Sequence, residues 1–424
     1  MTNSNVLKLS QPGTFTDLLT EILRKGAHAL LVQAVETEAA VFLETYAGLK
    51  TEDGRQRVVR HGHLPERAVM TGIGAVQVRQ PRLRDRGAGG ERIKFTPSIL
   101  PPYARRSKSL EVLLPILYLK GLSTGDFAEA LAALLGKDAP GLSASTIARL
   151  KDAWAGEHKS WEKRDLTAKR YVYVWADGIY LQARLEDDAQ CILVLIGATP
   201  EGTKELIGFC DGFRESAQSW RGLLLKLKQR GLRHAPELAI GDGALGFWKA
   251  LGEVWPTTRE QRCWVHKTAN VLNKLPKTLH SKAKRELQEI WMAETKANAL
   301  KAFDVFEKTY VVKYEKAVAC LTKDRYALLA FYDFPAEHWK HLRTTNPIES
   351  TFATVRHRTI RTKGCLSNDT AIAMVFKLLE AAQRSWRRLD GTGFLPKVIY
   401  GVKFKDGIEE QDASSYPQDQ TAAA

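Results

Sequence analysis

One acidic residue stands at the expected start of a helix whose continuation is basic. The segment Thr344–Ser350 reads Thr-Thr-Asn-Pro-Ile-Glu-Ser. In it, Asn346 suits the N-cap position, Pro347 the first helical position and Glu349 the third. Basic residues follow along the same expected helix: Arg356, Arg358, Arg361 and Lys363. A carboxylate beside a cationic face could hold a metal ion against a phosphate chain, but Asn-Pro-x-Glu is also an ordinary capping box, in which the glutamate only satisfies a backbone N–H.

Two aspartates occur in matching surroundings earlier in the chain. Asp177 precedes a glycine after a β-branched and aromatic run, and Asp242 lies between two glycines after another apolar run. Each could be only a turn residue, since Asp-Gly is common in turns. Together with Glu349 they also form a set of three carboxylates. Such a set suits one or two Mg²⁺ ions, which prefer oxygen ligands and assist in-line displacement at phosphorus.

The composition indicates a globular protein with a polyanionic partner. The 424 residues are 44% hydrophobic and 26% charged, and a chain of this length is too long for one simple core and favours two or three domains. The formal net charge of +15 favours nucleic acid, although charge alone does not separate DNA, RNA and an anionic membrane surface. No run reaches the roughly 18 apolar residues that a membrane span requires.

Two further features bear on location. The polar start of the chain lacks the apolar core of a secretion signal. The cysteines are few and scattered, which fits reduced thiols in a cytosol. They are Cys191, Cys210, Cys263, Cys320 and Cys365.

The first part of the chain is predicted to be mainly helical. Residues 14–48 show the apolar spacing of an amphipathic helix, and residues 58–84 show the short alternating runs of a small basic β element. Short helices are then expected at residues 110–120, 123–135 and 145–154. They fit a helix-turn-helix whose last helix would present Thr146, Arg149 and Lys151 to a major groove, or equally a packing module of three helices.

From residue 171 the pattern changes to that of an α/β domain. An antiparallel meander is predicted from a β-branched and aromatic run at 171–175, which Asp177-Gly178 and residues 179–181 follow, and from apolar runs at 191–196 and 205–209. Asp177 is expected at a strand end. A helix at 220–229 and a strand at 237–240 follow, and nearly all of 267–334 is expected to be helical. This order indicates a mixed sheet with helices on its faces.

Several segments together resemble the Mutator-type transposases of bacterial insertion sequences, a branch of the DDE transposases. They are Gly121–Thr124 (GLST), Ala176–Tyr180 (ADGIY), Gly241–Ala244 (GDGA), Arg262–Lys267 (RCWVHK) and Thr345–Arg356 (TNPIESTFATVR). The resemblance extends from about residue 14 to about residue 400. It implies that Asp177, Asp242 and Glu349 are a catalytic triad that binds Mg²⁺, with Mn²⁺ as a substitute, and that a helical insertion separates the last two.

The fold class expected on this basis is an α/β catalytic core, a ribonuclease H-like mixed sheet with an all-helical insertion, preceded by a mainly helical DNA-binding region. The expected domains are residues 1–90, an N-terminal helical and basic β region that binds DNA; 91–165, a helix-turn-helix-like DNA-binding domain; 166–266 and 343–405, the two parts of the ribonuclease H-like core; 267–342, the helical insertion; and 406–424, a flexible tail.

Cys263 and His266 allow more than one role. A Cys-x-x-His pair could supply two zinc ligands, but a structural zinc site needs four, so packing or hydrogen bonding is favoured. The resemblance implies that the pair supports the active site, and His266 could contact the scissile phosphate. The basic residues beyond Glu349 would contact DNA, with Arg356 stabilising transition-state charge, unless they form only a solvated helix face. Trp264 and Trp291 are predicted to be core residues and not base-stacking platforms.

The activity implied by the resemblance is DNA transposition. The protein would bind the terminal inverted repeats of an insertion sequence, cut a strand with water to expose a 3′-OH, and join that hydroxyl to target DNA by transesterification. The expected partners are double-stranded DNA and further copies of this chain, in a homodimer or larger assembly in the bacterial cytoplasm at the nucleoid. Two alternatives stay open: a non-catalytic DNA-binding regulator, and a nuclease that only hydrolyses DNA.

Overall fold

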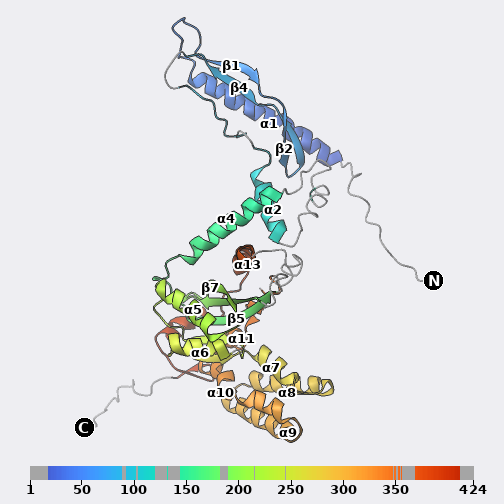
Figure 1. Ribbon diagram of the computed structural model, residues 1–424, viewed down its shortest axis with the longest axis vertical. Coiled ribbons are helices and arrows are strands. Elements are labelled where there is room, and N and C mark those ends of the chain that lie inside the picture. Colours follow the sequence, from blue (N-terminus) through green and yellow to red (C-terminus); the bar gives the residue numbers. More distant parts are fainter. Residues whose placement is uncertain are drawn as a thin grey trace, which may run out of the picture. The chain divides into compact units, whose positions relative to one another are not determined.

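The structure of this protein is a computed structural model that divides into two compact units, residues 1–150 and residues 151–424 (Figure 1). It describes residues 18–87, 92–101, 104–119, 131, 144–181, 190–213, 215–243, 245–346, 348–349, 352–353, 355 and 368–410.

The first unit combines a long helix with two small antiparallel sheets, as the sequence predicts. The helix is α1 (Leu18–Thr45), and the strands are β1 (Val58–His63), β2 (Arg67–Thr71), β3 (Gly74–Val78) and β4 (Pro81–Asp85). Strand β1 pairs with β4, and β2 pairs with β3. A small core of buried Val35, Val69, Val76, Val78 and Leu100 joins the helix to the strands, since each is at most 6% exposed.

The expected group of three short helices is described only in part. Helix α2 (Lys108–Leu119) and helix α4 (Ala144–Glu162) are present, and α4 extends beyond the predicted end at residue 154. The middle helix expected at 123–135 lies outside the described residues apart from Leu131. Arg149 is exposed on α4 and Lys151 is half-buried, while the side chain of Thr146 lies outside the described part. The helix-turn-helix therefore stays a prediction.

The second unit is built on a five-stranded mixed sheet with the order β7-β6-β5-β8-β9. The strands are β5 (Tyr173–Leu181), β6 (Gln190–Ala198), β7 (Lys204–Phe213), β8 (Leu238–Gly241) and β9 (Arg259–Arg262). The predicted antiparallel meander is confirmed as β5-β6-β7, while β8 runs parallel to both β5 and β9. The mixed α/β class predicted for this region is thus confirmed.

Helices cover both faces of this sheet. On one face, α5 (Ala217–Gln229) and α6 (Leu245–Val254) bury Trp220, Leu224 and Phe247 (Figure 1). Helix α5 starts at Ser216, whose side chain accepts a hydrogen bond from the Ser219 N–H. On the other face, the ring of Phe209 in β7 packs against residues of α4 and of α13 (Asn368–Gln383).

The block after β9 is nearly all helical, which confirms the prediction for residues 267–334. Its elements are α7 (Trp264–Leu272), η1 (Lys277–Leu279), α8 (His280–Met292), α9 (Lys296–Thr322), α10 (Arg325–Leu328) and η2 (Ala330–Asp333). Figure 1 shows α7, α8 and α9 grouped beside the sheet. Trp264 is 1% exposed and donates its indole N–H to the Leu328 carbonyl at 2.8 Å, so it is a core residue as predicted.

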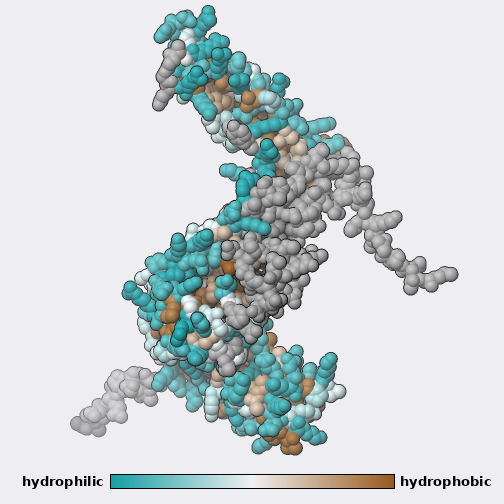
Figure 2. Space-filling view, viewed as in Figure 1, coloured by the Kyte–Doolittle hydropathy of each residue, from teal (hydrophilic) through white to brown (hydrophobic). Residues whose placement is uncertain are grey.

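The chain then returns to the sheet through short elements. They are η3 (Ala336–His338), α11 (Trp339–Leu342), η4 (Thr392–Phe394), α14 (Leu395–Ile399), β10 (Phe404–Lys405) and β11 (Ile408–Glu409). In the described part of the chain, no helix has both the length and the apolarity needed to cross a membrane. The face of the molecule visible in Figure 2 is mostly hydrophilic over the described residues.

Two histidines fasten the segment before Glu349 to strand β5. His338 is fully buried, with its Nε2 at 2.9 Å from the Gly391 carbonyl and its Nδ1 at 2.8 Å from the Tyr173 hydroxyl. A carbonyl only accepts, so Nε2 carries the hydrogen and Nδ1 accepts from the tyrosine. The backbone carbonyl of His341 accepts from the Trp175 indole at 3.0 Å. These bonds set where residues 343–349 approach the sheet.

Acidification should weaken this attachment. Burial, with a smaller effect of nearby Lys204, lowers the pKa of His341 to about 4, against the opposing effect of Asp390. Between pH 6.5 and pH 4 the unfolded chain therefore binds a proton that folded His341 does not, so stability falls with falling pH. At about 1.4 kcal/mol per pKa unit, the free energy of unfolding should drop by ~2–3 kcal/mol. Urea unfolding at a series of pH values tests this, with His341→Gln expected to flatten the loss. An equally steep loss in the variant contradicts it.

Candidate active site

The register of β5 against β8 brings the two aspartates together. Ala176 and Gly241 are partners across the parallel pair, so Asp177 and Asp242, each one position further along, are neighbours at the point where β8 ends and β5 continues to Leu181. Asp177 also pairs with Val194 inside the β5–β6 ladder. It is therefore a strand residue, and the alternative that it only forms a turn is wrong.

The backbone at Asp242 is held by two side chains. The indole N–H of Trp248 and the guanidinium of Arg262 each donate to the Asp242 carbonyl at 2.8 Å. The Arg262 guanidinium lies 4.3 Å from the centre of the Trp248 ring, so the two donors also pack on each other. Asp242 follows β8 directly, and these bonds fix the point where the chain leaves the sheet.

The helix that carries Glu349 begins one residue earlier than predicted. The carbonyl of Thr345 accepts from the N–H of Ile348 at 2.8 Å and of Glu349 at 3.1 Å, and Asn346 is already helical. The N-cap is therefore Thr345, and the prediction of Asn346 for that position is wrong. The difference arises because Thr345 is anchored by contacts from a distant part of the chain, which local sequence does not reveal.

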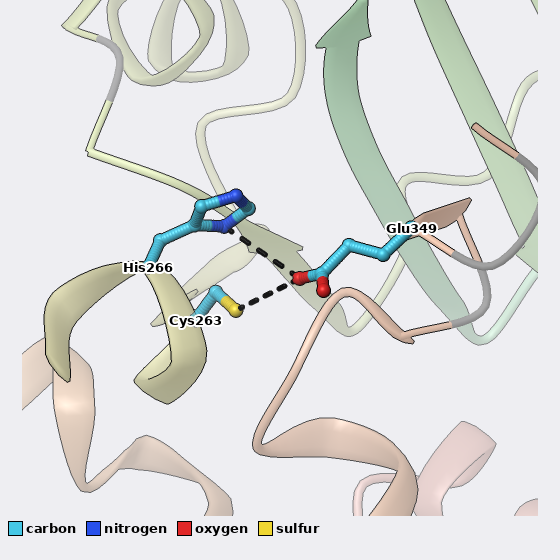
Figure 3. A group of neighbouring side chains, drawn as sticks. All are labelled: Cys263, His266 and Glu349. Carbon is cyan, nitrogen blue, oxygen red and sulfur yellow. Dashed lines mark hydrogen bonds and ion pairs between the residues drawn. The ribbon is translucent and has the colours of Figure 1, made fainter. Parts of the chain in front are cut away.

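The carboxylate of Glu349 faces Cys263 and His266, as Figure 3 shows. Its Oε1 lies 2.9 Å from the Thr345 hydroxyl, 3.9 Å from His266 Nδ1 and 4.0 Å from Cys263 Sγ. In the predicted capping box, the Glu349 carboxylate would accept a hydrogen bond from the backbone N–H of Asn346. That N–H instead points to the Thr344 hydroxyl at 3.4 Å. The contacts of Glu349 are thus with side chains, and the capping-box alternative does not describe them.

Two neighbouring hollows border these groups. The first, of about 230 Å³, is lined by Asp177, Gly178, Ile179, Tyr180, His266, Glu349 and Phe352. The second, of about 410 Å³, is lined by Asp242, Gly243, Lys267, Asn270, Asn273, Lys274, Cys320 and Lys323. The first combines two carboxylates with an imidazole, and the second combines a carboxylate with lysine and asparagine side chains.

The pKa values of Asp177 and His266 are both raised. Burial raises the pKa of Asp177 to about 7, with Asp242 and Glu349 adding to the rise and His266 opposing it. The pKa of His266 is raised to about 9, chiefly by its hydrogen bond with Cys263 and also by Asp177 and Glu349, against the effect of burial. Asp177 therefore feels the charges of Asp242 and Glu349, which come from two other segments.

Glu215 is a further acidic residue at this place that the sequence analysis missed. Burial raises its pKa to about 7, with Asp242 and Asp177 adding to the rise. Its carboxylate occupies the space beside Gly178, where a Cβ would lie 2.5 Å from Oε1. The only local signal is its position just before the Ser216 N-cap, which does not indicate chemistry.

The predicted DNA-binding residues are described only in part. Arg356, Arg358, Arg361 and Lys363 lie outside the described residues, so their contact with DNA stays a prediction. Arg149 and Lys151 are described on α4, without a contact that identifies a DNA surface.

Comparison with known proteins identifies the family. The sequence profile described as "Transposase, Mutator family" matches residues 2–388. The chain belongs to the Mutator family of transposases.

Relatives of this Mutator-family chain are transposases of insertion sequences. It is 52% identical over 303 residues to the transposase for insertion sequence element IST2 of Acidithiobacillus ferrooxidans, covering 70% of this chain and 99% of that protein. It is 52% identical over 295 residues to the transposase for IS6120 of Mycolicibacterium smegmatis, covering 70% of this chain and 91% of that protein. The transposase for IS256 in transposon Tn4001 of Staphylococcus aureus is 29% identical over 331 residues, covering 77% and 81%.

The close approach of α6 to the chain at Glu215 gives a prediction. A Cβ at Gly246 would overlap the Glu215 carbonyl and lie 2.8 Å from the Ala217 nitrogen, whereas a Cβ at Gly252 in the same helix meets nothing within 4 Å. Gly246→Ala should lower the free energy of unfolding by about 1–3 kcal/mol through overpacking. Gly252→Ala, the matched control, should raise it by about 0.5–1 kcal/mol, because alanine favours helix. Chemical denaturation measures both, and equal effects of the two changes would refute the packing argument.

Proposed function

We propose that this Mutator-family transposase cuts and joins DNA strands at the ends of its insertion sequence, with Asp177, Asp242 and Glu349 as the catalytic carboxylates. The observation that carries the proposal is that Asp177 of β5 and Glu349 of a distant helix start line one hollow, while the β5–β8 register puts Asp242 beside Asp177. We further propose that the mixed sheet is a ribonuclease H-like core and that residues 267–342 are an insertion in it.

The residues present fit a hard divalent cation. Asp177, Asp242 and Glu349 offer oxygen donors, and the raised pKa of buried Asp177 reflects negative charge gathered in a poorly solvated place. These three residues would hold Mg²⁺, or Mn²⁺ in its place. When bound, such an ion would polarise the scissile phosphate and favour deprotonation of the attacking oxygen.

The strand reactions need no covalent bond to the protein. In the first, a water oxygen forms a bond to phosphorus, the bond to the 3′ oxygen breaks, and that oxygen leaves as a 3′-OH. In the second, the exposed 3′-OH forms a bond to a phosphorus of target DNA and a second 3′ oxygen leaves. The carboxylates would orient the reacting groups, and His266, which lines the hollow of Asp177 and Glu349, would contact the phosphate.

We propose that duplex DNA is the polyanionic partner that the surplus of +15 favours, because the chain belongs to a transposase family. The hollow beside Asp242 offers hydrogen-bond donors for DNA phosphates in Lys274, Lys323 and Asn270. We propose that the N-terminal unit reads the terminal inverted repeats together with the start of α4, which carries Thr146, Arg149 and Lys151. A homodimer or larger assembly would hold both ends of the element.

Neutral isosteres of the three carboxylates test the catalytic assignment. Asp177→Asn, Asp242→Asn and Glu349→Gln should each bind labelled element ends like the wild type but lose strand cleavage and joining by at least about 100-fold in Mg²⁺, because each removes a charged donor. A fully active variant removes that residue from the triad. Nicking without joined products would favour a nuclease, and binding without cleavage by the wild type would favour a regulator.

The lysines beside Asp242 give a second test. Each lysine that no longer neutralises a phosphate of duplex DNA should reduce the slope of log K against log salt by about 0.9. Lys274→Ala with Lys323→Ala should therefore bind element ends more weakly and with a slope shallower by about 2. The control pair, Lys301→Ala with Lys308→Ala on exposed positions of α9, removes the same charge away from the hollow. Equal salt-dependence slopes for the two double variants would exclude contact between DNA phosphates and this hollow.

A further inference from the structure

Thr345 lies at the centre of the group formed by Cys263, His266 and Glu349. It is fully buried. Its hydroxyl oxygen lies 2.9 Å from Glu349 Oε1, 3.3 Å from Cys263 Sγ and 3.4 Å from His266 Nδ1. One hydroxyl thus touches all three side chains shown converging in Figure 3.

The hydrogen-bond capacity of this hydroxyl decides how the group is connected. A threonine hydroxyl has one hydrogen to donate and two lone pairs that accept. A carboxylate only accepts, and at 2.9 Å it is the nearest partner, so the hydrogen goes to Glu349 Oε1. The lone pairs are then available to an imidazole N–H from His266. The result is a chain of hydrogen bonds from imidazole through hydroxyl to carboxylate.

Thr345 is itself held by the start of α7. Its backbone N–H donates to Cys263 Sγ at 3.3 Å, and the Trp264 N–H donates to the Arg343 carbonyl at 2.9 Å. The thiol therefore acts on Glu349 mainly through Thr345, because its own distance to Oε1 is 4.0 Å. This gives the Cys-x-x-His pair a concrete task that its spacing alone does not specify.

We propose that Thr345 is a positioning residue that fixes Oε1 of Glu349, so that the second carboxylate oxygen is presented to the catalytic cation. This rests on the proposed strand-cleavage function. All the contacts of Glu349 with Thr345, Cys263 and His266 involve Oε1. A carboxylate that is hydrogen-bonded at one oxygen keeps one orientation. Residues that hydrogen-bond to a metal ligand in this way typically contribute about 10- to 100-fold to metal affinity or activity.

The same convergence could instead reflect a site for a soft metal ion. Sγ of Cys263, a nitrogen of His266 and an oxygen of Glu349 all lie within 4.8 Å of one another, and thiolate with imidazole is a donor set that Zn²⁺ favours. The buried hydroxyl favours the positioning role, since it bonds to these atoms directly and accounts for their approach. The zinc content of the purified protein is therefore measured beside the test of Thr345.

The test compares Thr345→Val, which keeps the shape and removes the hydroxyl, with Thr345→Ser, which keeps the hydroxyl. Mn²⁺ binding to the full-length, DNA-free protein is followed by electron paramagnetic resonance, beside thermal unfolding and cleavage of element ends. We expect Thr345→Val to weaken Mn²⁺ binding and to slow cleavage by roughly 10- to 100-fold, with DNA binding unchanged. Thr345→Ser should restore both.

Three results would overturn the positioning role. They are wild-type Mn²⁺ affinity in Thr345→Val, equal defects in the valine and serine variants, and stoichiometric zinc in the wild type that Cys263→Ser removes. If the wild type binds Mn²⁺ but cleaves no element end, the strand-cleavage function fails. The Mn²⁺ comparison then still decides the role of Thr345.

Discussion

The parallel register between β5 and β8 is the constraint on which the site depends. Pairing Ala176 with Gly241 places Asp177 beside Asp242, and the antiparallel register with β6 holds Asp177 within the ladder. Side chains alternate between the faces of a strand, so a slip of one residue would turn Asp177 to the opposite face. Strand β5 is fixed on both sides by neighbours and by a nearly fully buried core, which makes such a slip costly.

The third carboxylate depends on the sheet indirectly. Glu349 follows β8 by about a hundred residues, and the helical block in between returns to the sheet through His338 and His341, which bond to Tyr173 and Trp175 of β5. Those partners precede Asp177 on the same strand. Strand β5, which carries Asp177, therefore also anchors the segment that carries Glu349. The connection between β8 and Glu349 can be long because both of its ends are fixed to the same sheet.

Much of this arrangement could be predicted from the sequence, and the exceptions have a common cause. The meander, the helical block and the three carboxylates have local signatures in apolar spacing and in Asp-Gly and Asn-Pro-x-Glu motifs. Strand β9 (Arg-Glu-Gln-Arg) has none, because its buried Gln261 is stabilised by bonds to Leu328 and Phe331 from the far end of the helical block. The role of Glu215 and the N-cap at Thr345 likewise arise only from contacts between distant segments, which periodicity does not encode.

The cations around the site are themselves paired, which bears on the proposed metal binding in so basic a chain. Lys267 and Arg262 both border Asp242, yet both form ion pairs with Asp324, and Lys267 also donates to the Cys320 carbonyl. Asp324 thus compensates the positive charges of Lys267 and Arg262, which would otherwise act on Asp242. Because a buried charge pair needs both partners, replacing Asp324 would leave two buried cations beside the aspartates and favour a salt link to them. The charge balance of the site therefore extends to a residue outside both hollows.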